Sequence, residues 1–256
     1  MNLSTKIGAA ALLLLPSSAL GQFSINFSFS DPLTSDQQAA FDAAANTWEG
    51  LISGYQAGIS LTGVEIAVDS NSAQPNSGPI KALVQGGFVV SEQGRIFFDP
   101  LSPPSSDPIE LEILVTQSVA AVLGFGTLWE ANGLYARDSG EYTGINGLAA
   151  YQAEFDPSAT FIPVELYSGE SNVHWDEIDL GAGLTGITDS RGQDFGNELM
   201  TAWVGPSPSD AFVSQTTVGA LQDLGFTTAT AVPEPSTVLL GAIGALAGLF
   251  RRKRGE

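Results

Sequence analysis

The chain has 256 residues, no cysteine and a formal net charge of −19 at pH 7. Five of its nine Lys and Arg residues lie in the terminal segments, so the remaining body would repel nucleic-acid phosphates, and we expect no nucleic-acid partner. Without disulfides, this body of roughly 210 residues must fold around a hydrophobic core.

The N-terminus is typical of a secretory signal peptide. Lys6 precedes an uncharged run over 7–15, and the small-residue series Ala19-Leu20-Gly21 follows. A membrane-spanning helix needs about 20 apolar residues, so this run is too short to serve as an anchor. We expect residues 1–21 to be removed on export and the mature chain to begin near Gln22.

The C-terminus combines three features in order. A proline-rich motif comes first, formed by Val232, Pro233, Glu234 and Pro235. An apolar stretch over 237–250 follows, and a basic cluster formed by Arg251, Arg252, Lys253 and Arg254 comes last. An apolar helix that ends in cations should insert into a membrane and leave the cations on the cytoplasmic side.

This order resembles the PEP-CTERM sorting signal of Gram-negative bacteria. The resemblance implies that exosortase, a membrane-embedded enzyme, recognises and cuts the tail. We therefore expect inner-membrane anchoring by the C-terminal helix, followed by transfer to the cell surface or the extracellular space. A plain membrane anchor is the alternative.

The first half of the body predicts strands and one early helix. Alternating polarity over 23–29 indicates a half-buried strand, and 59–68, 87–90 and 95–98 favour further strands. A capping box is expected at the start of the helix, formed by Ser35 and Gln38. The helix should then bury one apolar face, made of Phe41, Ala45, Trp48 and Ile52.

A second helix is bounded by strong local signals. Asp107 is suited to cap it, Pro108 fits its first position, and Gly124 ends it after Leu123. Beyond this helix we expect irregular chain, a turn or helix over 197–201 and a terminal helix over 214–224. Strands followed by helices and long loops predict an α+β domain over 22–227, with a linker and tail over 228–256.

Five short segments carry a resemblance to a second family. They are LGFGTLW at 123–129, YTG at 142–144, HWDE at 174–177, NELMT at 197–201 and LQDLGF at 221–226. In this order they resemble bacterial leishmanolysin-like peptidases, a branch of the metzincins. The resemblance implies a mixed sheet with an N-terminal helix and an active-site helix, then an irregular C-terminal lobe that ends in a helix.

That family carries H-E-x-x-H on its active helix, where two histidines bind zinc and the glutamate acts as general base. Counting back from Gly124 aligns Gln117 with the first histidine, Ser118 with the glutamate and Ala121 with the second histidine. No residue at these three positions can perform the family's chemistry. The motif is degenerate.

Two other elements of the family's site have counterparts. His174, the single histidine of the chain, matches the third zinc ligand, and Met200 matches the methionine turn beneath the metal. Glu110 and Glu112 lie too far back along the helix to replace the lost ligands. We therefore expect a pseudoenzyme with no catalytic residue and no zinc or other cofactor, in which His174 is vestigial.

The predicted function is a binding or structural role at the cell surface or in the extracellular matrix, linked to exopolysaccharide or biofilm. Expected partners are an exosortase-type enzyme, and exopolysaccharide or surface proteins. An active secreted zinc metallopeptidase with an unorthodox metal site is the alternative. Trp129, Trp175 and Trp203 would favour ligand stacking if they line the former cleft, although core packing explains them equally well.

Overall fold

The computed structural model describes residues 23–70, 77–166, 172–177, 183–202 and 208–229. The predicted signal peptide, the C-terminal tail and Trp203 lie outside these residues. The described chain is a mixed α and β structure, which confirms the α+β class.

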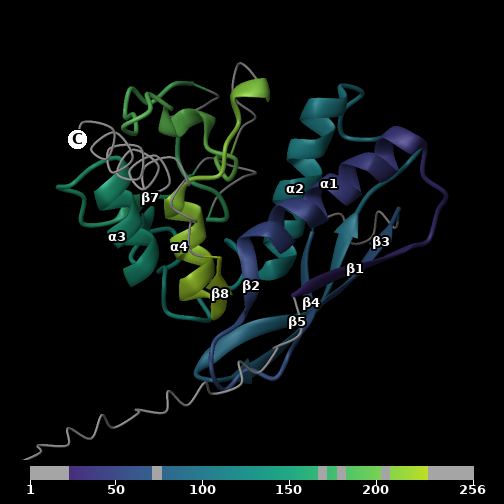
Figure 1. Ribbon diagram of the computed structural model, residues 1–256, viewed down its shortest axis with the longest axis horizontal. Helices are drawn as coiled ribbons and strands as arrows, with labels where there is room; N and C mark the ends of the chain where they lie inside the picture. The colour runs from purple at the N-terminus through teal and green to yellow at the C-terminus, as the bar shows by residue number, and fades with distance from the viewer. Residues whose placement is uncertain (1–22, 71–76, 167–171, 178–182, 203–207, 230–256) are drawn as a thin grey trace, which may run out of the picture.

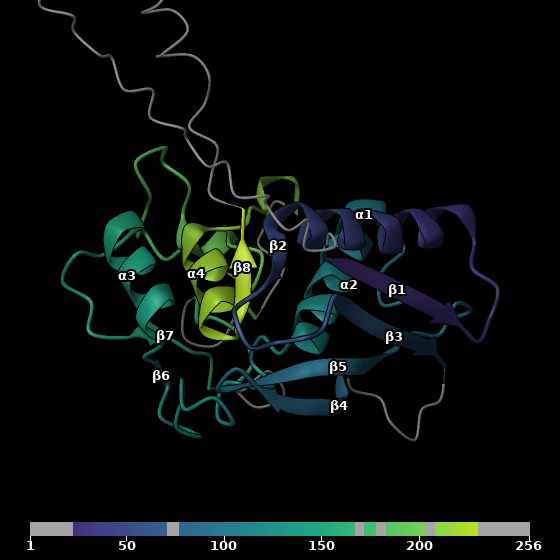
Figure 2. The same ribbon diagram turned by 60° about the horizontal axis from the view of Figure 1, so that its bottom comes forward.

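A four-stranded mixed sheet forms the first half. Its order is β1-β3-β5-β4, with three parallel strands and an antiparallel edge strand (Figure 2). The bounds are β1 Ser24–Phe29, β3 Gly63–Asp69, β4 Gly78–Gln85 and β5 Phe88–Phe97. Val64, Ile66 and Val68 alternate with more exposed residues along β3, so one face of that strand lies in the core.

Two helices, α1 (Ser35–Leu51) and α2 (Pro108–Leu123), lie side by side on one face of this sheet (Figures 1 and 2). Trp48 on α1 is fully buried and donates from Nε1 to the carbonyl of Thr116 on α2 at 3.0 Å. The close approach of α2 to β5 requires Gly94, because a Cβ there would lie 2.1 Å from Val122 Cγ1.

The predicted apolar face of α1 is confirmed at Phe41 and Trp48, which are both fully buried. Ala44 is buried in place of Ala45, and Ile52 is buried as the first residue of strand β2 (Ile52–Tyr55), just after the helix.

The predicted capping box was wrong by one residue. Thr34 caps α1: its Oγ1 accepts from Gln37 N at 3.3 Å, while Gln37 Oε1 accepts from Thr34 N at 2.9 Å. This register is favoured because the buried Gln37 side chain also donates to the carbonyl of Pro100, a contact distant in sequence.

The second half is built on a pair of packed helices, α3 (Ile145–Glu154) and α4 (Gln215–Asp223) (Figure 1). Short elements surround them: β6 Glu141–Tyr142, β7 Ile162–Pro163, and the 3₁₀ turns Phe195–Asn197 and Pro208–Asp210. After α4, strand β8 (Phe226–Thr228) pairs antiparallel with β2 and returns the chain to the first half. This pairing extends one residue past the predicted boundary at 227.

The structure contains elements that the sequence did not predict. Among them are the strands β2, β4, β6, β7 and β8 and the helix α3. The two predicted segments 87–90 and 95–98 belong to the single strand β5. The prediction of irregular chain between α2 and the turn at 197–201 was therefore wrong over residues 145–154.

Candidate functional site

Helix α2 is the element on which the degenerate motif lies. Asp107 Oδ1 accepts from the backbone amides of Ile109 and Glu110 at 2.9 and 3.1 Å, which satisfies two otherwise unpaired donors at the start of the helix. At the other end Gly124 adopts φ 111°, as a left-handed C-terminal cap. The predicted limits of this helix are confirmed.

A short backbone ladder holds the His174 segment beside α2. The amide of Glu165 donates to the carbonyl of His174 at 3.0 Å, and the amide of Trp175 donates to the carbonyl of Met200 at 2.9 Å. Gly126, at φ 69°, lets the chain after α2 pass close to this ladder, because a Cβ there would lie 2.4 Å from the carbonyl oxygen of Val173. These contacts fix His174 and Met200 next to each other.

Gln117 reaches the same turn from α2. Its side chain is 8% exposed, and Nε2 donates to the carbonyls of Leu199 and Thr201 at 2.8 and 3.0 Å. The amide therefore bonds to the residues on both sides of Met200. Both of its N–H donors are used within the protein.

His174 lies in a desolvated position. Burial lowers its pKa to about 4, against the opposing effect of a hydrogen bond with the backbone of Met200. The imidazole is therefore neutral at physiological pH.

The other motif positions supply no metal ligand. Ala121 lies one turn beyond Gln117 on the same side of the helix, and both Ser118 and Ala121 are partly exposed. Glu110 accepts from Ser105 at 2.7 Å near the start of α2, and the exposed Glu112 lies five residues before Gln117. One histidine, an engaged amide and an alanine do not fit a tetrahedral zinc ion, which takes three or four strong ligands.

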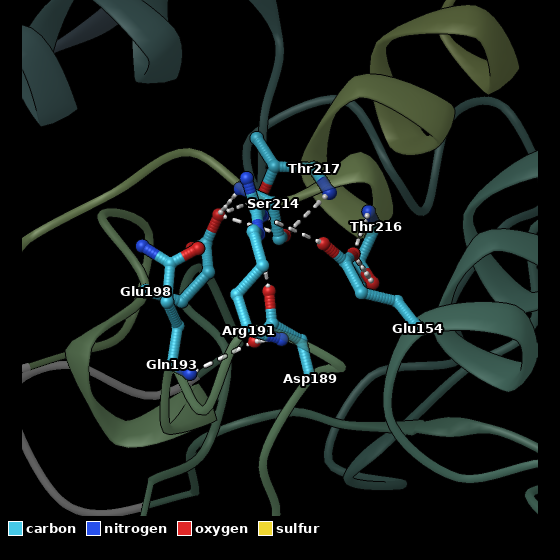
Figure 3. A network of polar contacts seen from close by, with 8 residues as sticks. All are labelled: Glu154, Asp189, Arg191, Gln193, Glu198, Ser214, Thr216 and Thr217. Atoms are coloured by element: carbon cyan, nitrogen blue, oxygen red, sulfur yellow. Dashed lines mark hydrogen bonds and ion pairs between the residues drawn. The ribbon is translucent and has the colours of Figure 1, made fainter. Parts of the chain in front are cut away.

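A second polar centre, which the sequence did not indicate as a site, is built around Glu198, two residues before Met200 in sequence (Figure 3). Glu198 is 2% exposed and accepts four hydrogen bonds, from Met200 N, Ser214 N, Ser214 Oγ and Thr217 Oγ1, at 2.5 to 3.0 Å. Desolvation raises the pKa of Glu198 to about 7, although these four donors oppose the shift. The carboxylate ties the Met200 turn to the start of α4.

Trp129 and Trp175, which were considered for ligand stacking, lie in the core instead of on a binding surface. Trp129 and Trp175 stack with ring centroids 4.9 Å apart, and Phe125 and Tyr142 pack edge-on against them. All four side chains are fully buried. Trp129 and Trp175 are therefore not available to stack on a sugar or a peptide.

A third group, Glu165, Asp176 and Glu177, gathers next to His174. The sequence placed Asp176 and Glu177 in the HWDE segment but gave no sign of Glu165, because the contact depends on pairing of distant backbone segments.

The sorting tail lies outside the described residues, so its motif is assessed from the sequence. Residues 231–254 match the PEP-CTERM protein-sorting motif. The chain carries a PEP-CTERM sorting tail. The motif indicates an exported protein that an exosortase-type enzyme sorts and processes.

No curated protein matches the chain. Among the described residues, no helix combines the length and the hydropathy required to cross a bilayer. The predicted membrane helix over 237–250 lies beyond them.

Proposed function

We propose that this PEP-CTERM protein is a cell-surface or extracellular-matrix component whose body is a leishmanolysin-like, metzincin-like domain without peptidase activity. Its role is binding or structural, within the exopolysaccharide or biofilm that surrounds the cell.

The observation that carries this proposal is the pair of hydrogen bonds made by Gln117. In the family that the sequence resembles, the first zinc-binding histidine occupies this position. Here the amide donates to the carbonyls of Leu199 and Thr201, which closes this face of α2 against the turn. These two carbonyls already accept both N–H groups of the Gln117 amide, which would otherwise be available to a ligand.

The arrangement of the remaining parts supports the same proposal. Three parts lie together: helix α2, which ends at the left-handed Gly124, the neutral His174, and the turn around Met200. Ala121 on the same helix offers no ligand atom. A scaffold that loses its catalytic groups would keep these contacts, because they also hold the two halves of the domain together.

The surface role is supported by the tail and by composition. PEP-CTERM proteins tend to occur in bacteria that make exopolysaccharide, and the net charge of −19 favours solubility outside the cell. Co-sedimentation with exopolysaccharide isolated from the producing strain tests this part, with dextran as a neutral control.

The absence of peptidase activity is tested with the full-length chain, purified in mild detergent and exposed to zinc. We expect less than stoichiometric zinc by elemental analysis and no cleavage of an unfolded protein substrate. A chelator selective for zinc over calcium should leave the melting temperature unchanged, because folding has no zinc-dependent contribution. About one zinc per chain, together with cleavage that the chelator abolishes, would establish an active peptidase with an unorthodox site.

A further inference from the structure

Glu165, Asp176 and Glu177 form an acidic cluster, with one carboxylate oxygen of each within 4.8 Å of the others. Glu165 and Glu177 are each 4% exposed, and Asp176 is partly buried. Three like charges seldom gather away from water unless something offsets them, because desolvation and mutual repulsion both oppose ionisation.

Backbone pairing places the three side chains together. Val164 and Trp175 form an antiparallel bridge, flanked by hydrogen bonds from Glu165 N to His174 O and from Asp176 N to Pro163 O, both 3.0 Å. The 199–202 turn joins the other edge through Trp175 and Thr201. The carboxylates therefore project from a paired ladder and not from separate loops, so their spacing is fixed before any ligand binds.

The lysine and arginine side chains of the described residues form ion pairs with other acids. These pairs are Lys81 with Glu92, Arg95 with Asp69, Arg137 with Glu130, and Arg191 with Asp189 and Glu154.

Glu177 has spare capacity to accept a ligand. Its Oε2 accepts from Ala202 N at 3.2 Å, whereas its buried Oε1 has no hydrogen-bond partner on another residue that the structure describes. Desolvation raises the pKa of Glu177 to about 7; its own amide and that of Ala202 oppose the shift, and Glu165 and Asp176 add to it. A buried oxygen without a donor, beside two further carboxylates, is suited to bind a cation.

We propose that Glu165, Asp176 and Glu177 bind one divalent cation, and that calcium is its physiological occupant. Carboxylate oxygens suit hard cations, whereas zinc sites are usually rich in nitrogen and sulfur ligands. Calcium–oxygen distances are about 2.3–2.6 Å, so ligands on opposite sides of the ion lie about 5 Å apart, which the cluster already satisfies. Calcium sites of extracellular modules have Kd values on the order of 10⁻⁴–10⁻³ M, which suits an exported protein.

The proposal is tested by thermal unfolding of the full-length chain in detergent, with and without millimolar calcium. Calcium should raise the melting temperature by about 5 °C, because it binds the folded state alone. Magnesium should raise it less, since it prefers to keep its waters and to use one or two carboxylates. Terbium provides a direct probe of occupancy, with luminescence sensitised by the neighbouring Trp175 and displaced by calcium.

The Glu177→Gln variant separates a cation site from a merely buried acid. In calcium-free buffer it should melt above the wild type, because it removes one of three like charges. It should also lose the calcium-dependent shift and bind terbium at least about tenfold more weakly. Glu141→Gln, at an exposed position on β6, is the matched control and should respond to calcium as the wild type does.

If Glu177→Gln does not fold, Asp176→Asn at the partly exposed position replaces it, with the same expected loss of binding. A wild-type chain whose melting temperature does not respond to calcium would overturn the proposal. So would a folded Glu177→Gln chain that keeps the full calcium response.

Discussion

Glu198 and Glu177 are two buried glutamates beside the same turn, and they differ in how many hydrogen-bond donors surround each carboxylate. Both are nearly inaccessible, and desolvation raises the pKa of each to about 7. Glu198 accepts four hydrogen bonds, whereas Glu177 accepts one from Ala202 and lies beside two further acids. Burial alone therefore does not reveal a site; the balance of donors against acceptors does.

Gln117 belongs with Glu198 in this comparison. Its amide donates to the carbonyls of Leu199 and Thr201, which are the residues on either side of Met200. The Met200 turn is thus held by two satisfied polar groups, whereas Glu177 beside it keeps one oxygen without a partner on another described residue. Substitutions of Glu198, Gln117 and Glu177 should therefore change the stability of the protein in different ways.

The largest effect is expected from Glu198→Leu. The backbone amides of Met200 and Ser214 would lose their acceptor inside the core, at a cost of about 3 kcal/mol or more in the free energy of unfolding. Urea denaturation measures the loss. Glu112→Leu, an exposed glutamate of α2, is the control and should change stability by less than about 0.5 kcal/mol. A loss at Glu198 no greater than in this control would contradict its structural role.

A smaller, pH-dependent effect is expected from Glu198→Gln. The folded pKa of about 7 lies above the unfolded value, so protonation of Glu198 stabilises the fold below about pH 4.5, and this contribution is lost as the pH rises through 7. The charged groups drawn around it are Glu154, Asp189 and Arg191 (Figure 3).

The difference in unfolding free energy between the wild type and Glu198→Gln should therefore fall by on the order of 2 kcal/mol between pH 5 and pH 8. Subtracting the two curves removes the contributions that both chains share, such as that of His174. A difference that stays constant over this range would show that Glu198 keeps the same charge throughout.

The smallest effect is expected from Gln117→Leu. This change leaves the carbonyls of Leu199 and Thr201 without their donor and should cost about 1–2 kcal/mol. Gln38→Leu, on the solvent side of α1, is a matched control that removes an exposed amide and should cost much less. Equal stability of the two variants would mean that the Gln117 bonds add nothing to the fold.

Local signals explain which parts of the fold were predictable. The cap, the first-turn proline and the terminal glycine of α2 all act within a few residues, so sequence alone located the helix. Strand β4 was missed because it lies at the sheet edge and has no fully buried residue to produce an alternating pattern. Helix α3 was missed because Gly144 provides no side-chain cap.

The site was less predictable, because its contacts join distant residues. The partners of Gln117 lie 82 and 84 residues away, and those of Glu198 at the start of α4 lie 16 and 19 residues away. The family resemblance directed attention to Gln117, His174 and Met200, which the structure places around one turn. It gave no indication of Glu165, which joins the acidic cluster through backbone pairing.

The proposal that the body keeps a metzincin-like scaffold without its zinc ligands is tested most directly by restoring them. In the full-length chain, Gln117→His, Ser118→Glu and Ala121→His would place two histidines one helical turn apart, with His174 as the third ligand. Glu177→Gln is included in every chain compared, so that the acidic cluster cannot compete for zinc. We expect about one zinc per folded triple variant by isothermal titration, and at least about tenfold weaker binding when His174→Ala is added. A folded triple variant that binds no more zinc than its parent, or that binds equally well without His174, would contradict the claim.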